Sequence, residues 1–247
     1  MNVLIACEES QRVCTEFRKK GHNAFSCDII EPSGGHPEWH IMRDVTEILN
    51  PRLADISVSL NSTDNVLATM TFDNIMFVTL DSTLHEVPRW DLIIAHPPCT
   101  YLTNTGNRWF NVEKYGDKAR ERIKAREAAV DFFMQFINAD CDKIVVENPI
   151  GCMSTRYQKP TQIIHPYYFA ESDGDINCER KATCLWIKGL PPLKYEIKFE
   201  PRIVKMGDGK NYSLWHMETF NLPKAERAKA RSKTFPGVAK AMAEQWG

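Results

Sequence analysis

The chain has 247 residues, of which 43% are hydrophobic and 26% charged, values of an ordinary globular protein rather than a disordered or membrane-spanning one. Its 31 Lys and Arg balance 32 Asp and Glu to a formal charge of -1, so no overall positive field attracts nucleic acid and any polyanion must bind a local patch. The length favours one α/β domain, 1–247.

The chain opens directly on a short apolar run, Val3–Ala6, with neither a basic leader nor a long hydrophobic stretch. We therefore expect no signal peptide, no membrane partner and a cytoplasmic location. The eight cysteines include no Cys-x-x-Cys pair, and a reducing compartment keeps thiols free. The sequence accordingly predicts neither disulfides nor a metal site.

Strands and helices are predicted to alternate along the chain. Five short apolar runs are expected to form buried strands: Val3–Ala6, Ala24–Cys27, Leu92–Ala95, Ile144–Val146 and Cys184–Ile187. Three segments have helical spacing: Ser10–Lys20, about Arg120–Asn138, and Gly237–Gln245. A strand, helix, strand order implies parallel pairing with right-handed crossovers. The predicted fold class is α/β, a doubly wound, mostly parallel sheet with ligand sites beyond the carboxyl ends of its strands.

The stretch from Asn50 to Arg89 is harder to interpret. Within it, Ala68–Leu80 is expected to form one or two strands or a hairpin, so we treat 50–89 as an elaboration between core strands. No internal repeat or low-complexity linker occurs, which supports one domain rather than a string of modules.

A hydrophobic strand running into two prolines and a cysteine makes the segment from Trp90 to Thr100 the most informative. Pro97 and Pro98 restrict the backbone, so we expect them to hold Cys99 rigidly and on display at the carboxyl end of the strand. A lone cysteine in such a place is more often structural than catalytic when nothing accompanies it.

A second segment, Lys143–Pro149, has the same form. It is a buried strand that ends in Glu147, Asn148 and a proline. Because the carboxyl ends of parallel strands share one edge of the sheet, Glu147 is expected to point into the same crevice as Cys99. The alternative is a glutamate that caps the following loop.

Together these two segments resemble the DNA (cytosine-5) methyltransferase family, whose Pro-Pro-Cys and Glu-Asn-Val signatures lie at the ends of two such strands; here Glu-Asn-Pro replaces Glu-Asn-Val. The resemblance implies a Rossmann-like methyltransferase fold and transfer of a methyl group from S-adenosylmethionine to carbon 5 of cytosine in DNA. It implies that Cys99 attacks ring carbon 6 and that Glu147, kept protonated in an apolar slot, donates to ring nitrogen 3.

The resemblance also implies a cofactor site. Val3–Ser10 occupies the place of the family's cofactor loop without its Phe-x-Gly-x-Gly glycines, and is similar to the short phage- and prophage-type branch, in which an Ala-Cys-Glu-x-Ser loop is common. Asp28 is expected to bind the ribose hydroxyls and Asp44 the adenine, with a helix or turn cap as the alternative for each. The implied cofactor-binding residues are Ala6, Cys7, Glu8, Ser10, Asp28, Asp44, Pro97 and Phe235. For Phe235, in the closing segment 231–239, core packing is the alternative.

The resemblance also implies a set of substrate-binding residues. The segment Glu179–Ile187 resembles the family's Gln-x-Arg-x-Arg element, with basic residues for contact to base or phosphate. Thr103–Trp109 is rich in Asn, Thr and Gly, and is expected to form a mobile loop that closes over an extruded base; a plain surface loop is the alternative. The implied substrate-binding residues are Pro98, Asn104, Arg108, Asn148, Arg180 and Lys181.

The region available for reading a base sequence is short, about 191–230, so weak sequence preference is expected. It carries a basic and aromatic mixture suited to phosphate contact and base stacking, or else to a local core. The members of this mixture are Lys205, Lys210, Tyr212, Trp215 and His216. The basic run 224–240 is either a nucleic-acid patch or a solvated helix face.

Other functions remain open at this point. The same chemistry on RNA or a free cytosine nucleotide suits the short recognition region and the neutral charge, and a catalytically silent nucleic-acid-binding protein suits the altered cofactor loop. Exocyclic amino methylation is disfavoured, since those enzymes place an aromatic residue after Pro-Pro. A cysteine hydrolase lacks an identifiable histidine partner, although His96 is near in sequence. An accessory protein or homo-oligomer is a possible partner, and a bacterial host or prophage origin is expected.

Overall fold

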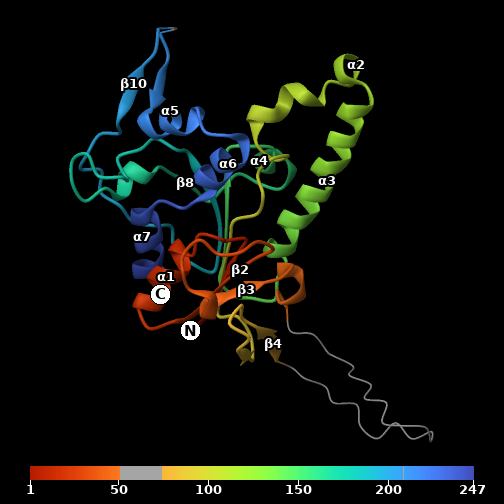
Figure 1. Ribbon diagram of the computed structural model, residues 1–247, viewed down its shortest axis with the longest axis vertical. Coiled ribbons are helices and arrows are strands. Elements are labelled where there is room, and N and C mark those ends of the chain that lie inside the picture. Colours follow the sequence, from red (N-terminus) through yellow and green to blue (C-terminus); the bar gives the residue numbers. More distant parts are fainter. Residues whose placement is uncertain (51–73, 208) are drawn as a thin grey trace, which may run out of the picture.

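A seven-stranded sheet forms the centre of the protein (Figure 1). The computed structural model describes residues 1–50, 74–207 and 209–247. The strand order is β3-β2-β1-β6-β7-β9-β8. Its strands are β1 (Asn2–Ala6), β2 (Asn23–Asp28), β3 (His40–Met42), β6 (Leu92–Ala95), β7 (Ile144–Pro149), β8 (Gln162–Ile164) and β9 (Thr183–Lys188).

Pairing in this sheet is mostly parallel. The pairs β1 with β2, β1 with β6, β2 with β3, and β6 with β7 run parallel, whereas β9 runs antiparallel to both β7 and β8. The predicted mostly parallel α/β sheet is therefore confirmed, and the arrangement is compatible with a Rossmann-like fold. All five predicted strands form within three residues of the expected bounds, because a strand buried on both faces leaves a continuous apolar run in the sequence.

Helices pack on both faces of the sheet. The α-helices are α1 (Arg12–Lys19), α2 (Val112–Tyr115), α3 (Asp117–Ile137), α4 (Met153–Arg156), α5 (Leu214–Phe220), α6 (Lys224–Ser232) and α7 (Pro236–Trp246). Short 3-10 helices are η1 (Pro37–Trp39), η2 (Val45–Glu47), η3 (Asn104–Phe110) and η4 (Pro166–Phe169). Helices α1 and α7 pack against each other, and α3 lies apart from them (Figure 1).

Alternate strand residues belong to two separate cores. Leu4 is in the cluster that contains Phe133 and Phe136 of α3. The next residue, Ile5, is in the cluster that contains Phe17 of α1 and Trp246 of α7. Fully burying one such side chain stabilises the fold by about 2 kcal/mol. The period-two alternation of β1 thus fixes the layered arrangement, with helices on each face of the sheet.

Two small hairpins lie outside the main sheet. Strands β4 (Ile75–Val78) and β5 (Leu84–Val87) pair antiparallel, as do β10 (Ile203–Lys205) and β11 (Asn211–Ser213). The hairpin expected within Ala68–Leu80 is therefore present in part but shifted toward the C-terminus, and 68–73 lies outside the described residues. The basic run 224–240 divides between α6 and α7.

The segment after Cys99 differs from the expected loop. Residues 104–110 form η3, because α3 holds this segment through two arginines. Arg126 donates from Nε to the carbonyl of Tyr101 at 2.9 Å and from Nη2 to Oδ1 of Asn107 at 2.7 Å, and Arg122 donates to the carbonyl of Thr100 at 3.2 Å. Over the described ranges, no helix is both long and apolar enough to cross a membrane.

Close backbone contact ties the loop after β7 to the segment that follows Cys99. Gly151 bridges to Thr103, and the amide of Cys152 donates to the carbonyl of Leu102 at 2.8 Å. A Cβ atom at Gly151 would lie 2.1 Å from the Leu102 carbonyl oxygen, so only glycine permits this approach.

We predict that Gly151→Ala lowers the free energy of unfolding by about 2 kcal/mol or more, because the new methyl group forces these two backbones apart. Urea denaturation measures the effect. Gly207→Ala is the matched control, since a Cβ there meets nothing within 4 Å. Equal stabilities for the two variants would contradict this account of the contact.

Candidate functional site

The site lies where the sheet reverses its direction of winding. Strands β1 and β6 are neighbours, and from them the chain winds outward to β2 and β3 on one side and to β7 on the other. In open α/β sheets ligands bind in the crevice at this switch point, beyond the carboxyl ends of the strands. A cavity of about 560 Å³ occupies the place, between the residues that follow β1 and β6 and helix α6.

The residues that line this cavity include members of the predicted cofactor-binding set and of the predicted catalytic and substrate-binding sets. They include Cys7, Glu8, Ser10 and Asp28 from the predicted cofactor set, Pro98 and Cys99 from the predicted substrate and catalytic sets, and also Glu9, His96, Lys229 and Arg231. Segments far apart in the sequence therefore meet at one crevice. Glu147 is not among the residues that line the cavity, but its Oε2 is hydrogen-bonded to Nδ1 of His96, which does line it.

Cys99 is the only exposed member of the eight cysteines, all of which lie in the described part of the chain. The amide of Asn148 donates from Nδ2 to the carbonyl of Pro97 at 2.8 Å, which fixes the proline pair against the end of β7. The amides of Leu102 and Thr103 both donate to the Cys99 carbonyl at 3.0 Å. The thiol is thereby displayed on a fixed backbone.

Nearby groups shift the pKa of the Cys99 thiol in opposite directions. Surrounding protein atoms displace water and raise the pKa of Cys99, since a thiolate is poorly solvated there. The Lys181 ammonium lowers this pKa, and the Glu147 carboxylate raises it again. The resulting pKa lies above the ordinary value, so the resting group is a thiol.

The Glu147 carboxyl group and the His96 imidazole form a buried pair. Nδ1 of His96 donates to Oε2 of Glu147 at 2.9 Å, and the two side chains are 10% and 12% exposed. Burial raises the pKa of Glu147, but the hydrogen bond from His96 and the Lys181 charge more than offset it, leaving this pKa below its ordinary value. The carboxyl group is thus ionised, in contrast to the neutral acid expected from the sequence.

The pKa of His96, the partner in this pair, is shifted as well. Burial lowers the pKa of His96, but the hydrogen bond to Glu147 and the nearby Glu147 and Glu8 carboxylates together raise it above its ordinary value. Nε2 of His96 is buried without a hydrogen-bond partner among the described residues. A histidine whose second ring nitrogen has no hydrogen-bond partner among the described residues therefore lines the cavity.

The loop after β1 adopts a glycine-like backbone without glycine. Cys7 has φ 58° and Gln11 has φ 55°. Residues other than glycine rarely adopt such positive φ angles, which cost about 1–3 kcal/mol each. Glu8 stabilises the loop by accepting from the amides of Val13 and Cys14 at 2.7 and 3.2 Å. Its carboxylate is therefore engaged with the start of α1.

Glu9 has a different environment from its neighbour. Its side chain is 8% exposed, and neither carboxylate oxygen has a hydrogen-bond partner within the part of the chain that the structure describes. Lys229 of α6 forms an ion pair with it at 3.6 Å. A buried carboxylate without hydrogen bonds is costly, so Glu9 can accept a hydrogen bond from a group in the cavity.

The two predicted aspartates lie in different places. Asp28, at the end of β2, lines the cavity, and its Oδ1 accepts from the amide of Ile30 at 3.3 Å. Burial raises the pKa of Asp28. Asp44 is exposed and caps η2 by accepting from the amide of Thr46 at 2.9 Å, away from the cavity lining. Of the remaining cofactor candidates, Ala6 and Pro97 are buried beside the lining.

Lys181 and Phe235 join the C-terminal segment to the site. The Lys181 ammonium donates to the Arg231 carbonyl at 3.2 Å and lies 5.7 Å from the ring centre of Trp215. Phe235 is 5% exposed, belongs to the core that contains α1 and α7, and has its ring centre 5.5 Å from that of Trp215. Trp215 also packs against this core, so its role is at least in part structural.

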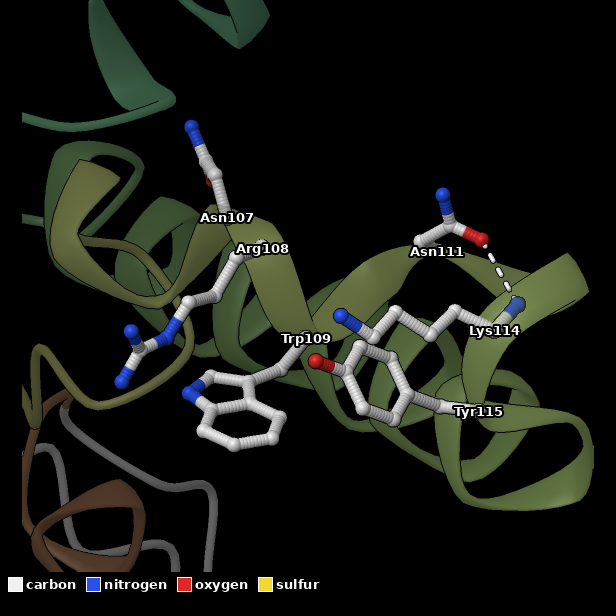
Figure 2. Close-up of a pocket in the computed structure, with 6 residues that line it drawn as sticks. All are labelled: Asn107, Arg108, Trp109, Asn111, Lys114 and Tyr115. Carbon is white, nitrogen blue, oxygen red and sulfur yellow. Dashed lines mark hydrogen bonds between the residues drawn. The ribbon is translucent and has the colours of Figure 1, made fainter.

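The other predicted substrate-binding residues lie outside the main cavity. Arg180 is exposed and lines a separate cavity of about 500 Å³ with His165, Tyr212 and His216. Its neighbour Glu179 is fully buried, where it pairs with Arg202 at 2.5 Å. Asn104 and Arg108 are exposed on η3. Arg108 lines the pocket of Figure 2.

Four charged or titratable residues that line the cavity are outside the predicted site sets: His96, Glu9, Lys229 and Arg231. His96 had a signal in its place directly before the two prolines, and Lys229 and Arg231 belong to the basic run 224–240, which was considered as a nucleic-acid patch. Glu9 had no signal that distinguishes it from a surface charge. No protein-family model matches the chain, and no curated protein matches it either. The site is accordingly interpreted from its chemistry, which combines a displayed thiol, a charged acid–base pair and free carboxylate oxygens.

We predict that Lys181→Gln slows alkylation of Cys99 by iodoacetamide about 3- to 10-fold near pH 8, because losing the ammonium raises the thiol pKa further. Since Cys99 is the one exposed cysteine, peptide mass spectrometry can follow its reaction in the folded protein. Arg180→Gln is the matched control. An unchanged rate for Lys181→Gln would show that this charge does not act on the thiol.

We predict that Glu147→Gln destabilises the protein by about 3 kcal/mol at pH 5–6, where both partners of the buried pair are charged. Because the pKa of His96 is raised in the folded state, its contribution to the free energy of unfolding is complete below pH 6.5. This contribution is lost as the pH rises through the pKa that His96 has in the folded protein. Because the pKa of Glu147 is lowered in the folded state, its contribution to the free energy of unfolding is complete above pH 4.5 and is lost at lower pH. Urea denaturation across pH 4–9 tests this, and a pH-independent difference would contradict it.

Proposed function

We propose that the chain is an S-adenosylmethionine-dependent methyltransferase that methylates carbon 5 of cytosine in DNA. The observation that carries the proposal is the single cavity at the β1–β6 switch point, where the displayed Cys99 thiol lies with the His96 of the buried acid pair. A cytosine ring needs a nucleophile at carbon 6 and a proton donor at nitrogen 3, and this cavity offers both kinds of group.

The residues of the cavity fit the proposed cofactor. S-adenosylmethionine presents an ammonium group, a positively charged sulfonium and two ribose hydroxyls. Glu9 offers buried carboxylate oxygens without hydrogen bonds, and Asp28 offers a partly buried carboxylate at the end of β2. The cofactor supplies, when bound, an electrophilic methyl group. Glu9 replaces Glu8 in the proposed cofactor set, because the Glu8 oxygens already accept from α1.

In the proposed reaction the exposed Cys99 thiol first loses its proton to solvent water, which the Lys181 ammonium favours. The thiolate then forms a C–S bond to carbon 6, and the ring electrons move toward carbon 5. With the cofactor bound, carbon 5 would accept its methyl group, and the electrons of the broken S–CH3 bond would stay on the cofactor sulfur as a neutral thioether. The proton shared between Nδ1 of His96 and Oε2 of Glu147 is available to ring nitrogen 3, where negative charge develops. Solvent water takes the carbon 5 proton, the C–S bond breaks with its electrons returning to sulfur, and ring nitrogen 3 returns its proton to the His96–Glu147 pair. These steps release the product and restore the thiolate.

The charged pair explains how an ionised glutamate can serve this reaction. A lone carboxylate has no proton to donate, but the pair holds one between two atoms 2.9 Å apart. Ring nitrogen 3 of neutral cytosine accepts hydrogen bonds, so on its approach it competes with the Glu147 oxygen for the proton that the pair shares. Proton donation by the pair therefore takes the place of the neutral acid that the family resemblance implies.

The geometry disfavours a cysteine hydrolase. Such an enzyme needs a histidine hydrogen-bonded to the thiol, so that the base can take its proton. Here Nδ1 of His96 bonds to Glu147, and Nε2 has no hydrogen-bond partner among the described residues, Cys99 included. Methyl transfer to RNA or a free cytosine nucleotide would use the same atoms, and stays the principal alternative substrate assignment.

We predict that Cys99→Ala lowers methyl transfer at least 1,000-fold, because no other group can form the C–S bond. The assay follows labelled S-adenosylmethionine with cytosine-containing DNA, RNA and cytidine triphosphate in separate reactions, and mass spectrometry locates the methyl group on the ring. Cys152→Ala, at a half-buried cysteine, is the matched control. Methylation by Cys99→Ala at the normal rate would refute the mechanism, and exclusive methylation of RNA or nucleotide would correct the substrate.

A further inference from the structure

A second concave surface lies on the segment that follows the nucleophile. We call it the aromatic–basic surface and define it by Arg108 and Trp109 of η3 and Lys114 and Tyr115 of α2 (Figure 2). It borders a cavity of about 550 Å³, which the amide side chains of Asn107 and Asn111 also line. An adjoining cavity of about 730 Å³ shares Trp109 and Tyr115.

Trp109 is exposed to a degree that folding does not explain. It is 43% exposed and is the only exposed member of the six tryptophans, all of which the structure describes. Its ring centre lies 5.0 Å from that of Tyr115, with the two rings tilted by 47°. Figure 2 shows the two rings next to each other, and Tyr115 is half-buried. Aromatic surface left open in this way is typical of a binding site.

The surface is held rigidly from behind. The Arg126 guanidinium lies 3.4 Å from the ring centre of Phe110 and donates to the side chain of Asn107. Asn111 caps α2 by accepting from the amide of Lys114 at 2.8 Å. Gly116, with φ 53°, ends α2 and lets α3 begin at once. The two rings are therefore set in place before any ligand arrives, which lowers the entropy cost of binding.

Charge on this segment differs from that of the whole chain. Residues 104–126 contain seven Lys and Arg against three Asp and Glu, whereas the complete chain carries a net charge of -1. Arg108 lies 4.8 Å from the ring centre of Trp109, and Lys114 lies 5.5 Å from that of Tyr115. Among the described residues no acidic side chain forms an ion pair with either cation, so both are available to an anion.

We propose that the aromatic–basic surface binds a single-stranded polynucleotide. An unpaired base stacks on Trp109 and Tyr115, and adjacent phosphates contact Arg108 and Lys114. Stacking requires a free base face, which a duplex does not present, so the ring pair selects single strands. The inference rests on the proposed function for the class of ligand, and deepens it by naming an unpaired strand as the form bound.

The placement of the surface supports this reading. Tyr101 and Arg122 line its adjoining cavity, and Arg122 donates to the carbonyl of Thr100, the residue after Cys99. The surface and the nucleophile therefore belong to one braced segment. A strand stacked here is held by the same backbone that displays the thiol. An acidic protein segment would use the cations but would leave the paired rings without a role.

The test is fluorescence polarisation of labelled oligonucleotides without S-adenosylmethionine: a twelve-nucleotide oligo-dT, the matching oligo-rU and a twelve-base-pair duplex. We expect Trp109→Ala to weaken oligo-dT binding at least 10-fold and Trp109→Phe to weaken it less than 3-fold. Arg108→Gln and Lys114→Gln should each lower the salt dependence by about one ion. Tyr195→Ala, at an aromatic residue 42% exposed elsewhere, is the control and should change nothing.

Each result has a stated meaning. Tighter duplex than single-strand binding, an unaltered Trp109→Ala variant, or equal displacement by poly-glutamate would overturn the inference. Stronger binding of oligo-rU than oligo-dT supports the surface and identifies RNA as the strand. Neither oligonucleotide contains cytosine, so their binding is measured independently of the methyl-transfer reaction. Trp109-dependent binding, combined with no methyl transfer to cytosine-containing DNA, RNA or nucleotide in the separate assay, retains the inference and rejects the proposed function. Trp109→Phe keeps the test valid if Trp109→Ala fails to fold.

Discussion

The hydrogen bond between His96 and Glu147 is the interaction on which the site depends. The parallel register of β6 and β7 sets Ala95 beside Val146, so the next residue of each strand faces the other at the carboxyl edge. Two buried charges are stable there only as a pair, since removing either leaves the other desolvated and uncompensated. The pair thereby fixes the protonation of both groups and the position of a shared proton beside the cavity.

The loop after β1 shows a second constraint at the same edge. Cys7 and Gln11 adopt left-handed backbone conformations that glycine would adopt without strain. Strain of this kind persists only when surrounding contacts enforce it, and Glu8 supplies them by engaging the first turn of α1. Both the strained loop and the charged pair border one cavity, so the protein concentrates its costly features where ligands of an α/β sheet bind.

Much of the fold was predictable because the central strands are buried on both faces and therefore leave continuous apolar runs such as Leu92–Ala95. The display of Cys99 followed from the restricted backbone of the two prolines before it. The ionised state of Glu147 was not predictable, because its partner lies 51 residues away and becomes a neighbour only through strand register. The helical turn at 104–110 was missed for the same reason: arginines of a distant helix hold it.

The most direct measurement is the mass of the adduct formed with DNA that contains 5-fluorocytosine, in the presence of S-adenosylmethionine. Fluorine on carbon 5 cannot leave as the proton does, so the C–S bond should persist after methyl transfer. The account predicts a peptide in which Cys99 carries a methylated fluorocytosine nucleotide. Methylation of ordinary cytosine on the ring without any such adduct, or an adduct on another residue, would contradict it.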